Sequence, residues 1–302
     1  EEVSFSNGDA VLKGTLTMPA DCDRKTPVLV MVTGSGLQNR DEELFGHKPF
    51  AVIADAFARA GIATLRYDDR GFGESTGDVV LCTTEDLKND ALAGVKLLRD
   101  RFERVGVIGH SEGGTIALML AGERQVGFAV SRAGMIVSGA EALLAQNRRA
   151  FECAGLPESE VEAFARLLSD TFTAIRTRAP LPSADDYDIT DALRKNYAAA
   201  LPSFRTPYME FFLGLDLSAS LSGITCPVMA RNGTKDTQIQ CDKIIAVLKA
   251  GLPSNSRSVI RAEDGLNHLF QHCVTGEVSE YKNIEETFSP EVISRMISWL
   301  KA

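Results

Sequence analysis

Short apolar runs that stop at glycine are the feature that most constrains the fold of this chain. Val28–Val32 is a run of five apolar residues, and Thr33-Gly-Ser-Gly36 follows it directly. A second short run, at residues 105–108, stops at Gly109. Apolar runs without polar alternation are typical of strands buried on both faces of a parallel sheet. Because parallel neighbours need crossover helices to join them, these runs predict an α/β fold.

Segments with helical periodicity lie between the predicted strands. Residues 49–60 begin with proline, place Phe50 and Phe57 on one face and are followed by Gly61, as expected for an amphipathic helix. Further helices are predicted near residues 87–98 (behind a cap of Thr83 and Asp86), 113–122, 243–250 and 290–301. Further strands are predicted near residues 62–67, 135–137, 228–231 and 258–261, and a hairpin near residues 3–6 and 11–18.

Residues 141–222 break the alternation of strands and helices. They are rich in Ala, Glu, Arg and Leu, with Pro and Ser near 180–183, and we interpret them as a helical insertion. The expected architecture is a mostly parallel sheet with helices on both faces, formed by residues 1–140 and 223–302, and a helical insertion at residues 141–222.

The charge and apolar patterning exclude several kinds of partner. The chain has 32 Lys and Arg against 41 Asp and Glu, a net charge of −9. An acidic chain argues against nucleic acid or an anionic membrane, because both need clustered cations. No segment has the roughly 20 apolar residues of a spanning helix. The sequence begins at Glu1, so we expect an exported protein (periplasmic or extracellular) if a signal peptide preceded it, and a cytoplasmic protein otherwise.

The cysteines form no recognisable metal or redox motif. No CxxC pair is present, which argues against a zinc ribbon or a thioredoxin-type site. Scattered cysteines in a chain with a large core are usually small buried hydrophobes, although the even number leaves disulfides open. The six are Cys22, Cys82, Cys153, Cys226, Cys241 and Cys273.

Gly109-His-Ser-Glu-Gly-Gly114 carries the strongest chemical signal. This G-x-S-x-G pattern directly follows a predicted buried strand and precedes an apolar helix, which is the context of a nucleophile elbow. In such a strained turn, glycines let strand and helix backbones approach closely, and the serine hydroxyl is exposed at the carboxyl end of the sheet. We therefore predict Ser111 as a nucleophile; the alternative is a serine in an ordinary strand-to-helix turn.

A serine nucleophile needs a general base, and the chain has four histidines. His268 follows the last predicted strand, where the base belongs in the chain order serine, acid, histidine. His272 lies one helical turn later and is the competitor. His110 is part of the elbow, with its side chain expected to point away from that of Ser111, and His47 lies in a loop that could approach the same face.

The acid of such a triad is expected after the penultimate strand. Asp236 ends the turn that follows the strand predicted at residues 228–231, so it can orient the imidazole and stabilise the imidazolium. Three rivals remain. Asp242 is expected to start the next helix, whereas Glu263 and Asp264 could be solvated loop charges.

An oxyanion hole needs two backbone N–H groups. The residue after the nucleophile, Glu112, supplies one. The second is expected from the small residues after the first buried strand, where Ser35 is the first choice and Gly36 or Leu37 the alternatives.

Together these pieces resemble the α/β-hydrolase family, and within it the bacterial serine esterases of the carboxylesterase and cinnamoyl-esterase-like group. The resemblance covers nearly the whole chain, although the family often has Pro where this chain has Leu37. The matching motifs are Gly14-Thr-Leu, Thr33-Gly-Ser-Gly with Arg40-Asp41, Arg66-Tyr-Asp-Asp-Arg-Gly-Phe-Gly-Glu-Ser75, Gly109-His-Ser-Glu-Gly-Gly114, Asn232-Gly-Thr-Lys-Asp236, Gly265-Leu-Asn-His-Leu-Phe-Gln271 and Ser289-Pro-Glu-Val292.

The resemblance implies an α/β-hydrolase fold and a serine esterase that acts on a small-molecule ester through an acyl-enzyme, with no cofactor and no metal. Ser111, His268 and Asp236 would be the catalytic triad, and the insertion would be a cap over the pocket. The charged segment at residues 68–70 is expected to be a structural ion network. As pocket residues we expect Leu37, His110, Tyr208, Phe211 and Phe212.

Two other function classes stay open. A peptidase, a thioesterase or an acyltransferase can use the same triad, because pocket shape selects the leaving group and the acceptor. A non-catalytic binding protein with a hydrolase fold is the third hypothesis, against which the intact Ser, His and Asp speak. The sequence leaves the oligomeric state open.

Overall fold

One eight-stranded sheet organises the molecule, for which the computed structural model describes all 302 residues. The strand order is β1-β2-β4-β3-β5-β6-β7-β8; the pairs β1–β2 and β2–β4 are antiparallel, and the other pairs are parallel. The strands are β1 (Glu2–Asn7), β2 (Ala10–Thr17), β3 (Val28–Val32), β4 (Ala63–Tyr67), β5 (Val105–His110), β6 (Ala129–Arg132), β7 (Val228–Gly233) and β8 (Val259–Glu263).

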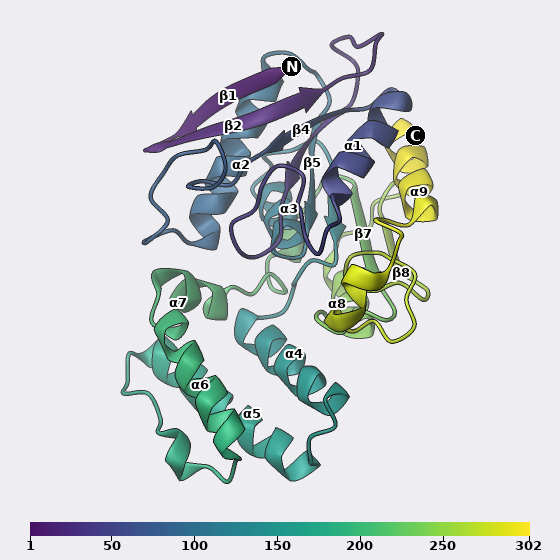
Figure 1. The fold of residues 1–302 in the computed structure, drawn as a ribbon. Helices are drawn as coiled ribbons and strands as arrows, with labels where there is room; N and C mark the ends of the chain where they lie inside the picture. Colours follow the sequence, from purple (N-terminus) through teal and green to yellow (C-terminus); the bar gives the residue numbers. More distant parts are fainter.

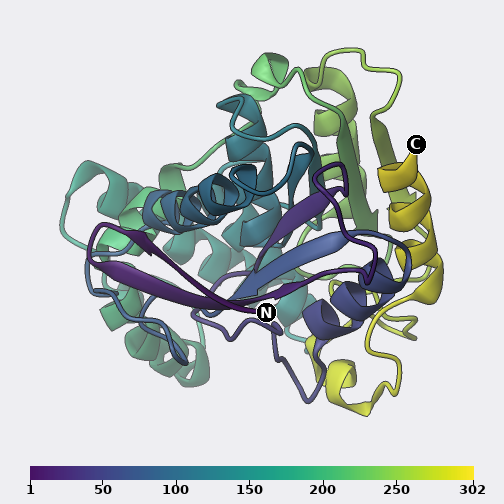
Figure 2. The ribbon, with the colours of Figure 1, turned by 90° about the horizontal axis from the view of Figure 1, so that it is seen from above.

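Helices cover both faces of the sheet (Figure 2). In β3, Val28, Val30 and Val32 face the layer of α2, α3 and α8, whereas Leu29 and Met31 face α1 and α9. Burial on both faces is the reason that this strand reads as an unbroken apolar run. The helices are α1 (Pro49–Arg59), α2 (Thr84–Arg99), α3 (Glu112–Gly122), α8 (Cys241–Gly251) and α9 (Pro290–Lys301). The predicted α/β fold is confirmed.

The strand predicted at residues 135–137 is wrong. The sixth strand is Ala129–Arg132, where Ser131 and Arg132 interrupt the apolar pattern although both are buried. The apolar residues 135–137 are also buried, but their backbone pairs with no strand. The Thr115 hydroxyl donates to the Met135 carbonyl at 2.8 Å and accepts from its N–H at 3.0 Å, so a side chain satisfies this segment.

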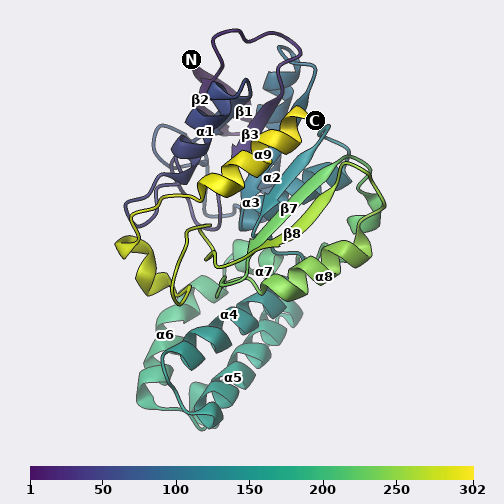
Figure 3. The ribbon, with the colours of Figure 1, turned by 90° about the vertical axis from the view of Figure 1, so that its right-hand side faces the viewer.

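Four helices are inserted between β6 and β7 and lie together beyond one end of the sheet (Figures 1 and 3). They have a hydrophobic cluster of their own, which includes Phe164, Leu167, Phe172, Leu193 and Tyr197. The helices are α4 (Gly139–Cys153), α5 (Glu158–Thr177), α6 (Asp191–Phe204) and α7 (Pro207–Gly214), with short 3-10 turns η1 (Ala184–Asp186) and η2 (Leu221–Gly223). The expected boundaries at residues 141 and 222 stay a prediction.

A short stem joins the two ends of this insertion. The Gly139 N–H donates to the Leu215 carbonyl at 3.2 Å, and the Leu217 N–H donates to the Ile136 carbonyl at 3.0 Å. The chain therefore leaves and re-enters the sheet region at one place. No helix in the structure is both long and apolar enough to cross a membrane.

Candidate active site

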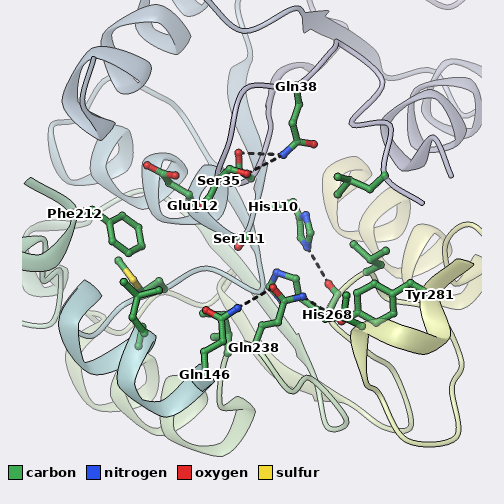
Figure 4. A pocket seen from close by; sticks show the side chains of 18 of the residues that line it. Ser35, Gln38, His110, Ser111, Glu112, Gln146, Phe212, Gln238, His268 and Tyr281 are labelled. Atoms are coloured by element: carbon green, nitrogen blue, oxygen red, sulfur yellow. Dashed lines mark hydrogen bonds between the residues drawn. The ribbon is translucent and has the colours of Figure 1, made fainter. Parts of the chain in front are cut away.

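Ser111 lies in a strained turn between β5 and α3. Its backbone has φ 54° and ψ −120°, a conformation that L side chains rarely adopt. Strain of this kind persists only where the surroundings impose it, and here the Ser111 N–H donates to the Arg132 carbonyl at 2.9 Å. The turn directs the side chain away from the sheet, into a cavity (Figure 4).

Two glycines make this turn possible. A Cβ atom at Gly109 would lie 1.9 Å from the carbonyl oxygen of Gly113, and a Cβ atom at Gly113 would lie 2.1 Å from the carbonyl oxygen of Val32. Strand and helix backbones therefore pass so closely that no side chain fits, which is the steric reason for both glycines of the G-x-S-x-G pattern.

The structure brings His268 and Asp236 together. The His268 Nδ1 lies 2.7 Å from the Asp236 Oδ2, and both side chains are almost fully buried. The other carboxylate oxygen accepts from the backbone N–H groups of Gln238 at 2.8 Å and Ile239 at 2.9 Å. Both oxygens of Asp236 are thus held, which fixes the carboxylate as the acceptor of an imidazole N–H.

The rival histidines have other partners. The His47 ring contacts the Tyr281 carbonyl at 3.0 Å and the Thr287 hydroxyl at 3.1 Å. His272 is exposed and pairs with Glu286 at 3.0 Å. Neither lines the cavity that contains Ser111.

The rival acids lie outside the cavity as well. Asp242 is in the first turn of α8, as expected. The idea that Glu263 could be a solvated loop charge is wrong, because it is buried and paired with Arg231 and Arg295. Asp264 accepts from a threonine hydroxyl on the neighbouring turn.

A cavity of about 380 Å³ lies between the sheet and the inserted helices, with Ser111 and His268 in its wall (Figure 4). The Ser111 hydroxyl and His268 are not hydrogen-bonded to each other; such contacts are often long without substrate and tighten when it binds. The inserted helices contribute Ala142, Leu143, Gln146, Tyr208, Met209 and Phe212.

Three of the five predicted pocket residues line this cavity: His110, Tyr208 and Phe212. Leu37 and Phe211 do not line it. Sequence reasoning missed the polar residues of the wall, because no local motif marks them. These are Gln38, Gln146, Gln238 and Tyr281, of which the last three form a chain of hydrogen bonds at 3.3 and 3.2 Å.

The loop after β3 contains the three residues considered for the second oxyanion donor, Ser35, Gly36 and Leu37. Among the three candidates for the second donor, only Ser35 lines the cavity, as Glu112 also does. The N–H groups of Ser35 and Glu112 donate no hydrogen bond within the chain. Asp69 holds the loop by accepting from the Thr33 hydroxyl and from the Gln38 N–H, each at 2.8 Å. Burial raises the pKa of Asp69 to about 8 despite these bonds.

The Glu112 carboxylate connects the elbow to the inserted helices. It accepts from the Tyr208 hydroxyl of α7 at 2.5 Å and from the Thr84 hydroxyl of α2 at 2.6 Å. Burial, aided by this carboxylate, raises the pKa of Tyr208. Each oxygen of the only carboxylate in the cavity wall therefore already accepts a hydrogen bond.

The charged segment at residues 68–70 and the six cysteines do not line the cavity. In the segment at residues 68–70, Asp68 pairs with Arg40 and Arg70 pairs with Asp90, as expected for an ion network. All six cysteines are free; Cys82 and Cys241 are buried and the other four are partly exposed. No group of three or more His, Cys, Asp or Glu side chains is placed to hold a metal ion.

The family of the chain follows from its match to a family model. The model described as serine aminopeptidase, S33, matches residues 48–268, which include the elbow, Asp236 and His268. The chain belongs to this family of α/β hydrolases. Esterase EstD of Thermotoga maritima is 36% identical over 112 residues, an alignment that covers 36% of this chain and 27% of EstD. This α/β hydrolase thus matches only about a quarter of the length of that curated relative.

Solved structures share the fold of this S33-family hydrolase over its full length. Proline iminopeptidase of Mycobacterium smegmatis superposes with a TM-score of 0.61 at 17% identity, covering 100% of this chain and 98% of that one. Est1E of Butyrivibrio proteoclasticus, solved with ferulic acid bound, gives 0.57 at 18% identity, covering 99% and 100%. The Pyrococcus furiosus esterase Pf2001 gives 0.60 at 18% identity, covering 100% and 90%.

Proposed function

We propose that this protein is a serine esterase that cleaves carboxylic esters of small molecules through an acyl-enzyme. The observation that carries the proposal is the buried His268–Asp236 pair, which opens onto the same cavity as a serine held on a strained elbow. A positioned nucleophile, a base and a group that orients the base form the arrangement that acyl transfer needs.

In this mechanism the Ser111 oxygen attacks the ester carbonyl carbon while its proton moves to the His268 Nε2. Asp236 keeps the proton on Nδ1, so the other ring nitrogen is free to accept. The carbonyl oxygen becomes an oxyanion that accepts from the N–H groups of Ser35 and Glu112. Collapse breaks the bond to the leaving alcohol, which takes the proton from His268. Water then repeats these steps on the acyl-enzyme and releases the acid and free Ser111.

The cavity wall favours uncharged esters over peptides with a free amino terminus. An aminopeptidase must hold the ammonium group of its substrate, for which an available carboxylate is the strongest partner. The one carboxylate that lines this cavity, Glu112, is occupied by Tyr208 and Thr84. Most of the other lining side chains are hydrophobic. We also propose that α4–α7 act as a cap, because α4 and α7 complete the wall.

A substrate panel tests this proposal. Matched p-nitrophenyl esters, aryl amides and acyl thioesters are offered to the wild type and to Ser111→Ala, with Ser298→Ala on the exposed face of α9 as the control serine. We expect esters to be cleaved fastest, Ser111→Ala to lose on the order of 10⁶-fold in kcat, and the control to be unchanged. A fluorophosphonate should label the wild type and Ser298→Ala but not Ser111→Ala.

The same panel identifies the competing outcomes. Faster cleavage of aryl amides of amino acids with a free amino group than of the esters would indicate a peptidase. Faster cleavage of the thioesters would indicate a thioesterase. Full activity in Ser111→Ala would overturn the serine mechanism altogether.

A further inference from the structure

A buried cluster of charged residues lies behind the candidate active site. Glu42, His110 and Arg132 are each at least 97% buried. Glu42 follows the loop after β3 that carries Ser35, which we call the oxyanion loop. It has φ 54°, in the left-handed region that glutamate rarely adopts. Burying a charged side chain in a strained conformation is costly, so its contacts must compensate.

The side-chain hydrogen bonds of Glu42 and His110 reach three segments that carry a proposed catalytic group. His110 directly precedes Ser111, and its Nδ1 lies 2.9 Å from the Glu42 Oε1. Its Nε2 lies 2.9 Å from the backbone carbonyl oxygen of His268 (Figure 4). The same Glu42 oxygen accepts from the N–H of Gly34 at 3.2 Å, next to Ser35. One carboxylate and one imidazole thus connect the elbow, the oxyanion loop and the loop that carries His268, which we call the base loop.

The chemistry of the acceptors locates one proton of His110 and shows that a second is shared with Glu42. A carbonyl oxygen only accepts, so the His110 Nε2 carries a proton. The opposite ring nitrogen faces Glu42 at hydrogen-bond distance, so one further proton lies between Nδ1 and Oε1, on either atom. A neutral imidazole beside an ionised carboxylate would leave one of the two contacts without a proton. Glu42 and His110 therefore act as a unit.

Arg132 supplies the counter-charge. Its guanidinium lies over the rings of Phe50 and Phe288, 5.2 Å from each centroid, and its Nη2 is 3.6 Å from the second oxygen of Glu42. Burial lowers the pKa of Arg132 to about 10, which leaves it a cation at neutral pH. Because Nε and Nη2 make no hydrogen bond, Arg132 stabilises Glu42 by charge and stacking without fixing its geometry.

We propose that Glu42 and His110 are positioning residues that hold the base loop and the oxyanion loop in register around Ser111. The inference rests on the proposed function, since it assumes that Ser111 and His268 react. Neither residue is hydrogen-bonded to a reacting atom. Each bonds to a backbone atom beside a reacting group, and the His110 ring also packs against the His268 ring, with the centroids 4.7 Å apart. Misplacement of such groups by about 1 Å can cost on the order of 100-fold in rate without affecting how the substrate binds.

Glu42→Gln separates this role from simple packing. An amide has nearly the same shape as the carboxylate, but its oxygen only accepts and its nitrogen only donates. If the amide oxygen of the variant accepts from Gly34 and from the His110 Nδ1, the neutral His110 ring carries its only proton on Nδ1. It then has none to donate to the His268 carbonyl. If the nitrogen donates to Nδ1, the Gly34 N–H loses its acceptor. One of the three connections is lost in either orientation.

The experiment compares Glu42→Gln with Glu263→Gln in the full-length protein. Glu263 is a matched control, because it is equally buried and paired with arginines but lies outside the cavity. For Glu42→Gln we expect kcat to fall about 10- to 100-fold, KM to stay within about twofold, and labelling of Ser111 by a fluorophosphonate to slow in parallel. Glu263→Gln should lose stability in urea but keep kcat within about twofold.

The outcomes separate this inference from the proposed function. Folded Glu42→Gln with kcat within twofold of the wild type overturns the positioning role while the esterase proposal stands. Activity that survives Ser111→Ala overturns the esterase proposal whatever Glu42 does. If Glu42→Gln does not fold, His110→Gln, which can reach only one of the two acceptors, decides on the same criterion of lower kcat at unchanged KM.

Discussion

At the scale of single residues, Asp236 is the most tightly held group of the candidate triad, and its role can be tested with one atom. In Asp236→Asn the amide nitrogen can face the imidazole and favour the tautomer that keeps its proton on Nε2, which cannot accept from Ser111. We expect kcat to fall about 10⁴-fold, with KM little changed, in ester hydrolysis assays. Asp242→Asn, an exposed change in the first turn of α8, is the control and should keep wild-type kcat. Loss of kcat in Asp264→Asn, together with wild-type kcat in Asp236→Asn, would show that Asp264 rather than Asp236 is the acid.

Asp69 makes the stability of the oxyanion loop depend on pH. Its pKa is raised by burial to about 8 in the folded protein from the ordinary 3.8 of an aspartate, so between these values the folded state holds a proton that the unfolded state has released. The contribution of Asp69 to stability is complete below about pH 4 and is lost as the pH rises through 8. Asp69→Asn removes this titration.

The free energy of unfolding, measured in urea, should therefore fall in the wild type as the pH rises from 5 to 8, but the Asp69 titration cannot lower it in Asp69→Asn. Over this range the variant should gain stability relative to the wild type. The gain should be on the order of a few kcal/mol, since one pKa unit corresponds to about 1.4 kcal/mol. Parallel curves for the two proteins would mean that Asp69 titrates normally.

At the scale of elements, replacing either of two glycines of the same helix by alanine should have opposite effects on the free energy of unfolding. Gly113 and Gly122 both belong to α3. A Cβ atom at Gly122 would have its nearest contact at 3.8 Å, whereas one at Gly113 would collide with backbone atoms of β3. Gly122→Ala should raise the free energy of unfolding by up to about 1 kcal/mol, because alanine favours the helix. Gly113→Ala should lower it by about 3 kcal/mol or more. Equal effects in thermal unfolding would disprove the close approach at the elbow.

Local signals explain which elements could be predicted from the sequence. The apolar run of β3, the proline and glycine around α1 and the glycines of the elbow act over a few residues, and each element was found. The sixth strand was misplaced because Ser131 and Arg132, both buried, look polar in the sequence. No local signal marks Glu42, because its contact is with His110, which lies 68 positions away in the sequence. The pairing of Asp236 with His268 could be predicted, because chain order and loop position, rather than contacts, point to these two residues.

At the scale of the whole molecule, the cavity depends on both the core and the inserted helices. Phe212 of α7 lines the cavity and stacks on Tyr208 with the ring centroids 5.6 Å apart, whereas Phe172 of α5 packs inside the inserted helices. Both are buried, so Phe→Ala should cost each about 3 kcal/mol or more of stability. Only Phe212→Ala should also shift the ratio of kcat/KM between short-chain and long-chain esters. The same shift in Phe172→Ala, or none in Phe212→Ala, would assign Phe212 to packing alone.

The stem at the base of the inserted helices bears on how such a molecule can diversify. Two backbone hydrogen bonds join residues 136–139 to residues 215–217, so the segment between them begins and ends at one place beside the sheet. Loop-closure entropy grows only slowly with the length of the loop. The stem is therefore a natural crossover point for recombination: a segment from a relative could be exchanged there while the elbow and the His268–Asp236 pair are inherited intact. Substrate selectivity, set in part by the inserted helices, would then change separately from the reacting groups of the core.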